Sequence, residues 1–301
     1  MSWFYEALVR AEAKPRDDEK VGVGTVAQGG ESFLSEIEAL SPTLVSARES
    51  TLEAAPSPAS KVLRASGFRH LGMALREDSR LVFHSEPMSM PAEQFRLLRR
   101  SLVQAFPAGG ALMVTSPGAG DGKTLTALNL CACLADAGDA TLLVEVDLRR
   151  PSMKKVFGCT IDPPGVEDAL KGKVTPECAT YFVDELGFYA SMVATVPRNP
   201  SHLLGGTGCK DLLAWARQRF RWIVFDTAPV MPNADVAELL PAVDAALLVV
   251  RAQRTPKELS RRAFDVLGKR LYGVVLNEAT LSSAPYYRYL SDYCHPALRA
   301  S

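Results

Sequence analysis

Short runs of apolar residues recur through the last two thirds of the chain, with room for a helix between one run and the next. Each run is four to six residues long and is almost free of charged side chains. Runs of this kind predict buried strands. The predicted strands are residues 111–115, 141–146, 222–225, 245–250 and 273–276.

Longer segments before and between these strands repeat their apolar residues at helical spacing. The predicted helices are residues 91–106, 123–137, 209–220, 233–240 and 255–268. The first has Pro91 in its first turn, a position that favours proline. Near-continuous apolar strands separated by helices predict an α/β fold with a mostly parallel sheet covered by helices on both faces.

The first ninety residues show a different pattern. Residues 3–13 have the spacing of a short amphipathic helix, whereas residues 14–60 are rich in Lys, Glu, Gly, Ser and Pro. That second composition buries too little apolar surface to offset chain entropy, so it predicts a flexible linker. Residues 61–90 are mixed and predict no definite element. We therefore expect the folded domain over residues 91–281, followed by a tail over residues 282–301.

The composition is that of a globular protein without a charge bias. The 301 residues are 47% hydrophobic, and Lys+Arg and Asp+Glu both total 34, which argues against nucleic acid as a partner. The six cysteines include no CxxC pair, and Cys131 and Cys133 point apart on a helix, so reduced thiols are expected rather than zinc. A signal peptide and a span of roughly 18–20 apolar residues are both missing from the pattern, which predicts a cytoplasmic chain.

A glycine-rich segment joins the first predicted strand to the helix that follows. It has the sequence SPGAGDGKT over residues 116–124, and its three glycines let the backbone fold closely around phosphates. The start of the helix adds partial positive charge. Lys123 can reach the terminal phosphates of a nucleoside triphosphate, and the hydroxyl of Thr124 can hold Mg²⁺. Pro117 stands where such loops usually have their first glycine.

Carboxylates follow two of the other predicted strands. Asp226 ends the run 222–225, where a carboxylate can bind Mg²⁺ through water, and Glu145 and Asp147 end the run 141–146. The last two side chains point to the same side of an extended chain. Ligands of open α/β sheets bind at the carboxyl ends of strands. We expect one of the pair to help hold Mg²⁺ and the other to accept a proton from an attacking hydroxyl; the alternative is that they only cap the next helix.

Together these segments resemble the bacterial tyrosine kinases (BY-kinases) of capsule and exopolysaccharide synthesis, in particular their cytoplasmic autokinase module. The resemblance covers about residues 88–293. SPGAGDGKT is similar to the family's Walker A motif, LLVEVDLRRP to its Walker A′ motif and IVFDTAPV to its Walker B motif. NPSHLL at 199–204 resembles the family's NPSELL segment, and GVVLNE at 273–278 resembles its last strand. The opening MSWFYEALVRAE resembles the amino-terminal helix of some members.

This resemblance implies an ATP-dependent and Mg²⁺-dependent tyrosine autokinase that regulates polysaccharide synthesis and chain length. The implied catalytic residues are Lys123, Glu145, Asp147 and Asp226, and the implied metal ligands are Thr124, Asp147 and Asp226. The implied ATP-binding residues are Gly118, Ala119, Gly120, Asp121, Gly122, Lys123, Thr124, Leu125 and Asn277, the last of them near the adenine. Glu145 departs from the family, which usually has Asp there. Since a 1 Å displacement can cost about 10²-fold in rate, the effect of the extra methylene on activity is left open.

Two further features match the same family. Glu93, Arg96 and Arg99 fit its E-x-x-R-x-x-R motif, and their spacing places them along one edge of a helix. The resemblance implies that this edge joins subunits in a ring, and the alternative is a solvated face with internal ion pairs.

The tail contains four of the eight tyrosines of the chain, namely Tyr286, Tyr287, Tyr289 and Tyr293. A polar segment near a chain end is expected to be mobile. The resemblance implies phosphorylation of these tyrosines in trans; packing of the aromatic rings onto the sheet is the alternative.

The implied partners are further copies of the chain, a membrane polysaccharide co-polymerase that recruits it to the inner face of the membrane, and a tyrosine phosphatase. Two other functions stay open. One is an ATPase switch of the MinD/ParA-like group. Many members of that group have an extra lysine early in the loop, where this chain has Ser116, Pro117 and Gly118, and this difference argues against the switch. The other is a catalytically weak ATP-binding scaffold for the co-polymerase.

Overall fold

The computed structural model of the chain describes residues 67–74, 80–232 and 234–279. All of these described residues belong to one compact unit. The helix predicted at 3–13, the linker predicted at 14–60 and the tail at 282–301 lie outside the described residues. Within the described ranges, none of the helices combines the length and the apolar character that crossing a membrane requires.

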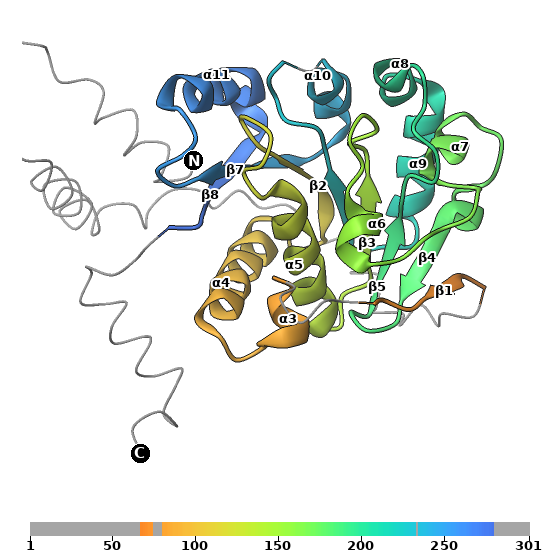
Figure 1. Ribbon diagram of the computed structural model, residues 1–301, viewed down its shortest axis with the longest axis horizontal. Coiled ribbons are helices and arrows are strands. Elements are labelled where there is room, and N and C mark those ends of the chain that lie inside the picture. Colours follow the sequence, from red (N-terminus) through yellow and green to blue (C-terminus); the bar gives the residue numbers. More distant parts are fainter. Residues whose placement is uncertain (1–66, 75–79, 233, 280–301) are drawn as a thin grey trace, which may run out of the picture. The chain divides into compact units, whose positions relative to one another are not determined.

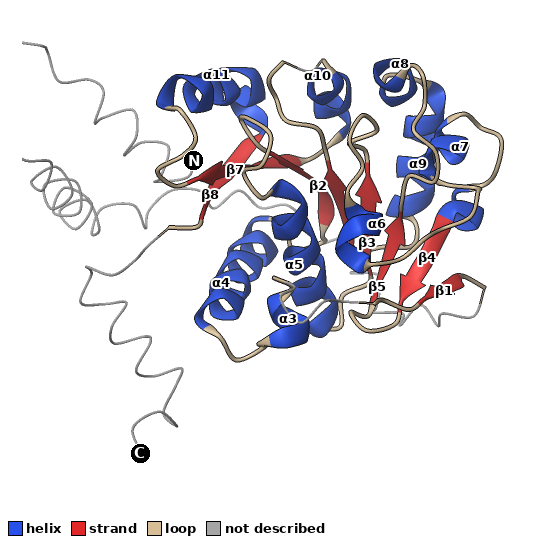
Figure 2. Cartoon of the chain, viewed as in Figure 1, coloured by secondary structure: helices blue, strands red, loops and turns tan. Residues whose placement is uncertain are grey.

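Eight strands form one sheet in the order β1-β4-β5-β3-β6-β2-β7-β8 (Figure 2). Every neighbouring pair is parallel except β4 and β5, which form an antiparallel hairpin. The predicted mostly parallel α/β fold is therefore confirmed. The strands are β1 (Arg69–Leu71), β2 (Gly110–Thr115), β3 (Thr141–Glu145), β4 (Thr180–Val183), β5 (Phe188–Ser191), β6 (Trp222–Asp226), β7 (Ala245–Arg251) and β8 (Leu271–Asn277).

Helices cover both faces of the sheet (Figure 1). One face is covered by α3 (Val82–Ser85), α4 (Met90–Ala105), α5 (Lys123–Asp136) and α6 (Met153–Phe157). The other face is covered by α7 (Val166–Leu170), α8 (Pro200–Leu204), α9 (Thr207–Arg217), α10 (Asp235–Leu239) and α11 (Lys257–Leu267). Short 3₁₀ turns span Pro176–Ala179, Leu240–Ala242 and Gly268–Arg270.

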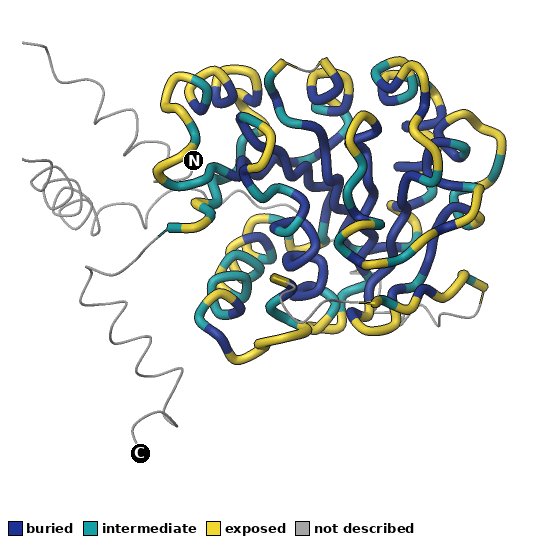
Figure 3. The backbone as a smooth tube through the Cα atoms, viewed as in Figure 1, coloured by how far each residue is buried: buried dark blue, intermediate teal, exposed yellow. Residues whose placement is uncertain are grey.

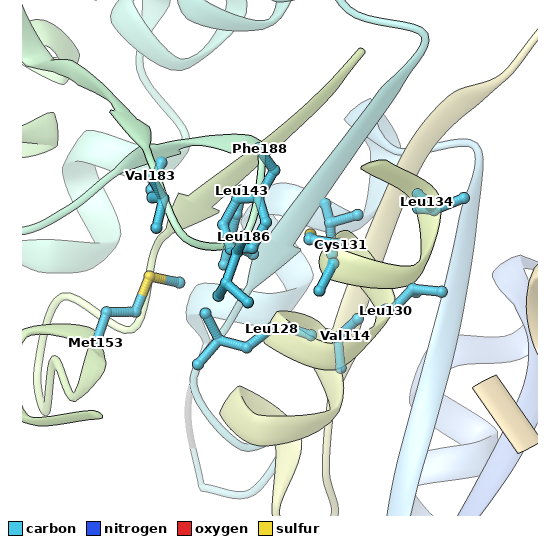
Figure 4. Close-up of a cluster of buried hydrophobic side chains, with 14 of the residues drawn as sticks. Val114, Leu128, Leu130, Cys131, Leu134, Leu143, Met153, Val183, Leu186 and Phe188 are labelled. Atoms are coloured by element: carbon cyan, nitrogen blue, oxygen red, sulfur yellow. The ribbon is translucent and has the colours of Figure 1, made fainter. Parts of the chain in front are cut away.

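Helix α5 lies between the sheet and the outer helices α3 and α4. Ten of its 14 residues are buried, as expected of a helix that is apolar all round. Its Leu128 and Cys131 pack with Val114 of β2 and Leu143 of β3 in one core (Figure 4). Figure 3 shows the central strands buried and the outer faces of the helices exposed. Leu128 is fully buried, so its truncation to Ala would cost about 2–5 kcal/mol.

All five predicted strands and all five predicted helices are present, with ends that differ by a few residues. The helix predicted at 233–240 is shorter than expected, because α10 passes into a 3₁₀ turn at Leu240. The sequence analysis predicted neither the strands β1, β4 and β5 nor the short helices α3, α6, α7 and α8. None of these is longer than five residues, which is too short for a helical or alternating period to be recognised.

The sheet topology brings three distant segments to one edge. Strand β6 lies between β2 and β3, and Asp226 pairs in register with Val114 on one side and with Glu145 on the other. The carboxyl ends of these three parallel strands therefore meet, and the loops that follow them share one end of the sheet. This is where open α/β sheets bind ligands.

Candidate active site

The side chain of Asp121 ties the glycine-rich loop between β2 and α5 together and to a neighbouring segment. Asp121 Oδ2 accepts from the N–H of Gly118 at 3.0 Å, and Asp121 Oδ1 accepts from the hydroxyl of Thr255 at 2.8 Å. Gly120 and Gly122 have φ of 86° and 99°, a conformation that glycine adopts without strain. Helix α5 begins directly after Gly122, so its first N–H groups have no partner within the helix and are available to an anion.

Asn277, at the end of β8, supports this loop. Its Nδ2 donates to the carbonyl of Asp121 at 2.9 Å. A Cβ on Gly122 would lie 2.1 Å from the same nitrogen, so a larger residue here would displace the amide of Asn277. The amide of Asn277 thus lies on the loop backbone, and the residue is not among those that line the adjoining cleft. Its predicted position near an adenine stays a prediction.

Four predicted residues converge at the carboxyl ends of β2, β3 and β6. The ammonium of Lys123 lies 2.9 Å from Oδ2 of Asp147 and 3.8 Å from Oδ1 of Asp226. The hydroxyl of Thr124 donates to Oδ2 of Asp226 at 2.7 Å. Burial opposes the charge of Lys123, but the nearby charges of Asp226 and Asp147 outweigh it and raise the pKa of this lysine. The loop lysine is therefore held charged beside two carboxylates.

Asp226 is the most deeply buried of these groups. It is fully buried, and burial raises its pKa to about 7 although Lys123 and Thr124 act in the opposite direction. Within the described residues its Oδ1 has no hydrogen-bond partner. A buried carboxylate oxygen without a partner is costly unless another group binds it. This oxygen, next to the Thr124 hydroxyl, fits a divalent cation.

The described residues contain no group of three or more His, Cys, Asp or Glu side chains that could hold a metal ion on their own. Mg²⁺ does not require such a group, because it is usually bound by one or two carboxylates together with substrate phosphates and water. The pairing of Asp226 with a threonine hydroxyl beside a phosphate-binding loop is consistent with that mode.

Glu145 has a different environment from Asp147. Its Oε1 accepts from the backbone N–H groups of Ser152 and Met153 at 2.6 and 2.8 Å, and its Oε2 accepts from Val193 at 3.0 Å. Burial raises the pKa of Glu145, while these three hydrogen bonds lower it. Because Ser152 and Met153 lie at the start of α6, the carboxylate accepts N–H groups at the beginning of that helix. The predicted catalytic role of Glu145 stays a prediction.

A cleft of about 580 Å³ opens beside these groups. Its lining includes the predicted residues Ala119, Lys123, Leu125 and Asp147 and two residues that the sequence did not single out, Arg150 and Ser152. Their position in the sequence could have indicated them, because both follow Asp147 within five residues, just beyond the carboxyl end of β3. The hydroxyl of Ser152 lies 3.1 Å from that of Thr124.

The predicted interface edge lies on α4, away from this cleft. Arg96 pairs with Glu93 one turn earlier and donates to the carbonyl of Pro87 at 2.8 Å. Among the described residues, Arg99 has no hydrogen-bond or ion-pair partner, and with Arg96 it lines a groove of about 520 Å³. On this edge, Glu93 and Arg96 are therefore already paired with each other, whereas the guanidinium of Arg99 is available to a partner. The predicted phosphorylation sites, Tyr286, Tyr287, Tyr289 and Tyr293, lie outside the described residues.

No protein-family model matches the chain. Among curated proteins, tyrosine-protein kinase YwqD of Bacillus subtilis is 30% identical over 228 residues, which are 72% of this chain and 96% of YwqD. Tyrosine-protein kinase Wzc of Salmonella typhi is 30% identical over 233 residues, which are 73% of this chain but 32% of Wzc. The chain thus spans nearly all of one relative and about a third of the other.

Solved structures give a consistent result. The chimerical protein CapA2B2 has a TM-score of 0.63 and 26% identity, with 71% of this chain and 95% of that chain covered. The kinase domain of the Escherichia coli tyrosine kinase ETK has a TM-score of 0.61 and 25% identity, with 69% of this chain and 85% of that chain covered. The shared sequence over almost the whole of YwqD, together with the fold, shows that this chain belongs to the bacterial tyrosine-protein kinase family.

Proposed function

We propose that the chain is an ATP-dependent protein-tyrosine autokinase that regulates capsule or exopolysaccharide synthesis and chain length. The observation that carries this proposal is the convergence of Lys123, Thr124, Asp147 and Asp226 around one phosphate-binding loop. The relatives named tyrosine-protein kinase, one of them in a Klebsiella pneumoniae cps region, support the choice of acceptor and pathway.

Thr124 and Asp226, with Asp147, are the residues that would hold Mg²⁺. When bound, this ion neutralises charge on the phosphates of ATP. Lys123 contributes a second positive charge from the loop, and the N–H groups at the start of α5 contribute hydrogen bonds to phosphate oxygens. Lys123 and Thr124 lie in the first turn of α5 and Asp226 ends β6, so helix and strand hold three of these side chains in place.

Asp147 is the carboxylate of the Walker A′ pair that lines the cleft, so it is the one placed to accept the proton of an attacking tyrosine hydroxyl. In that step the tyrosine oxygen forms a bond to the γ-phosphorus, the bond from that phosphorus to the leaving ADP oxygen breaks, and the hydroxyl proton passes to Asp147. A carboxylate within hydrogen-bond reach of the hydroxyl suits this role.

The acceptors in this proposal are the tail tyrosines of a neighbouring subunit. Tyr286 follows Asn277 by nine residues, and an extended segment of this length spans at most about 30–32 Å. The α4 edge with Glu93, Arg96 and Arg99 would join the subunits into a ring. We further propose a cytoplasmic protein without nucleic-acid partners, which a membrane co-polymerase recruits to the inner face of the membrane and a tyrosine phosphatase resets.

Mass spectrometry of the purified protein after incubation with Mg²⁺ and ATP tests this function. We expect phosphotyrosine on the tail in the wild type and none in Lys123→Met. ATP-dependent assembly without any phosphotyrosine would instead identify a scaffold, and ATP hydrolysis without phosphotyrosine or assembly would identify a switch.

A further inference from the structure

The carboxylate of Glu145 joins two segments that are about forty residues apart in sequence. It has no exposed surface, and it accepts the backbone N–H groups of Ser152, Met153 and Val193. Both of its oxygens are occupied in this way. A carboxylate offers about four acceptor positions, and three are filled by main-chain donors.

These hydrogen bonds extend to the metal-binding hydroxyl. Glu145 fixes the backbone of Ser152, and the side chain of Ser152 reaches the hydroxyl of Thr124 at 3.1 Å. Thr124 in turn donates to Asp226. Glu145 therefore acts on Thr124 through one intervening residue, whereas its own oxygens are directed at the backbone.

A second buried carboxylate holds only one of the two segments. Glu167 of α7 is 1% exposed and accepts the N–H groups of Ala194 and Thr195 at 3.1 and 2.7 Å. The three consecutive N–H groups that begin at Val193 thus all donate to a buried carboxylate, the first to Glu145 and the next two to Glu167. Glu167 makes no contact of this kind with Ser152 or Met153, so it provides a matched comparison for Glu145.

We propose that Glu145 is a positioning residue: it locks the start of α6 to the exit of β5 and so holds the Ser152 hydroxyl against Thr124, which sets the affinity of the site for Mg²⁺. The effect on Mg²⁺ rests on the proposed function, whereas the contacts of Glu145 with the backbone do not depend on it. The longer side chain is part of the argument, because Asp at position 145 would withdraw the carboxylate by one methylene from donors on both sides. Partners of metal ligands typically change metal affinity by about 10–100-fold when they are replaced.

Two measurements on the full chain test this role without phosphoryl transfer. The first is hydrogen exchange, followed by mass spectrometry over residues 148–158 and 190–200 in EDTA. The second is a Mg²⁺ titration of the binding of a fluorescent ADP analogue. The variants are Glu145→Gln, Glu145→Asp and Ser152→Ala, with Glu167→Gln as the control.

We expect Glu145→Gln and Glu145→Asp to exchange faster in both segments and to require about tenfold more Mg²⁺. Ser152→Ala, which keeps the carboxylate and its backbone contacts, should show the same loss of Mg²⁺ affinity with normal exchange at residues 190–200. Glu167→Gln should exchange faster only at residues 190–200 and bind Mg²⁺ as the wild type does. The double variant of Glu145→Gln and Ser152→Ala should be no weaker for Mg²⁺ than Glu145→Gln alone.

The inference is overturned if Ser152→Ala binds Mg²⁺ normally, or if Glu145→Gln leaves exchange in both segments unchanged. Wild-type Mg²⁺ affinity in Glu145→Asp with loss in Glu145→Gln would make position 145 a direct ligand and would also overturn it. Ser152→Ala keeps the test valid even where a Glu145 variant folds poorly. If the wild type binds no nucleotide at all, the proposed function fails, while hydrogen exchange in Glu145→Gln still decides the backbone role.

Discussion

The ammonium of Lys123 lies 2.9 Å from the carboxylate of Asp147, although the two residues follow different strands. This contact joins the phosphate-binding loop to the Walker A′ segment. Both side chains are largely buried, so each depends on the other for compensation of its charge. The pair therefore holds the loop lysine against the Walker A′ segment.

Lys123→Met should keep the fold and lower autophosphorylation by at least about 10²–10³-fold, as expected for the loss of a preorganised group that stabilises transition-state charge. The metal-free variant should also be destabilised by about 3–5 kcal/mol, because Asp147 is left buried without its cation. Phosphotyrosine blotting and thermal melting in EDTA are the measurements. The exposed Lys210 of α9 supplies the control, Lys210→Met, and an active Lys123→Met protein would remove this lysine from the mechanism.

Asp147→Asn and Asp226→Asn should each reduce the Mg²⁺ dependence of nucleotide binding. Both changes keep the side-chain shape and delete a charge next to the proposed cation. Nucleotide affinity measured with Mg²⁺ should fall toward the value measured in EDTA. Asp211→Asn, at an exposed position of α9, should behave like the wild type. Unchanged metal dependence in both site variants would contradict the assignment of these ligands.

The pKa of Asp226 predicts a pH dependence of the metal-free protein. Because burial raises this pKa to about 7 in the folded state, the folded protein binds a proton that the unfolded chain releases near pH 4. The resulting stability is complete below about pH 4 and is lost as the pH rises through about 7. Thermal melting in EDTA at pH 5.5 and 8 should show this loss in the wild type and a smaller one in Asp226→Asn. If Asp226→Asn lost more thermal stability than the wild type between these two pH values, the raised pKa of Asp226 would be contradicted.

Mg²⁺ binding should show the opposite trend with pH. A metal ion must displace the proton of Asp226, so the apparent Mg²⁺ affinity should fall by up to about tenfold per pH unit below about 7. Titration of the fluorescent ADP analogue with Mg²⁺ at pH 6 and pH 8 measures the difference. An affinity that does not change between these two values would exclude Asp226 as a ligand that has to lose a proton.

Oligomerisation should depend more on Arg99 than on the other members of the α4 edge. Arg96 already pairs with Glu93 and with a carbonyl in the same chain, whereas the Arg99 guanidinium is available to a partner. Arg99→Ala and the triple variant Glu93→Ala, Arg96→Ala and Arg99→Ala should both elute as monomers and still bind ATP. Light scattering after gel filtration measures the mass, with Arg262→Ala of α11 as the control. A wild type that is monomeric with and without ATP would contradict the interface.

Phosphorylation of the tail should occur in trans. A Lys123→Met protein cannot label itself, so label on Tyr286, Tyr287, Tyr289 or Tyr293 after mixing with an active, tail-deleted partner must come from that partner. Each phosphate adds about −1.5 to −2 charges, so the unphosphorylated protein should be the more oligomeric form. If the label in this mixture appears only on other tyrosines, the alternative, in which the tail tyrosines pack onto the sheet, is favoured instead.

The sequence predicted the parallel strands and the nucleotide loop because those features are local. The run ALMVT and the segment GDGKT each contain their own signal within a few residues. The hairpin of β4 and β5 was missed, although FYAS and TYFV flank a four-residue turn that ends in Gly187 with φ of 69°. Its strands are short, and their stability comes from pairing with distant strands, which the local pattern does not encode.

The hydrogen-bond partners of Glu145 could not be predicted from its position in a motif. Alternation along an extended strand puts residues 145 and 147 on one side, which led to the expectation that both carboxylates face the nucleotide site, one to help hold Mg²⁺ and the other to accept a proton. In the structure the chain turns after Glu145, where β3 ends, and the two side chains separate. One of them meets Lys123, and the other meets three backbone N–H groups contributed by segments that only the tertiary fold brings near.

The central position of β6 also has a consequence for biosynthesis. Strands β2 and β3 are close in sequence but do not pair; β6 lies between them and joins both. Trp222 is translated 77 residues after Glu145, so a growing chain exposes the nucleotide loop long before the strand that completes its sheet. Asp226 arrives with that strand. A nascent chain therefore cannot assemble the proposed Mg²⁺ site before β6 is made, and we expect tight nucleotide binding only from a polypeptide whose synthesis has passed β6.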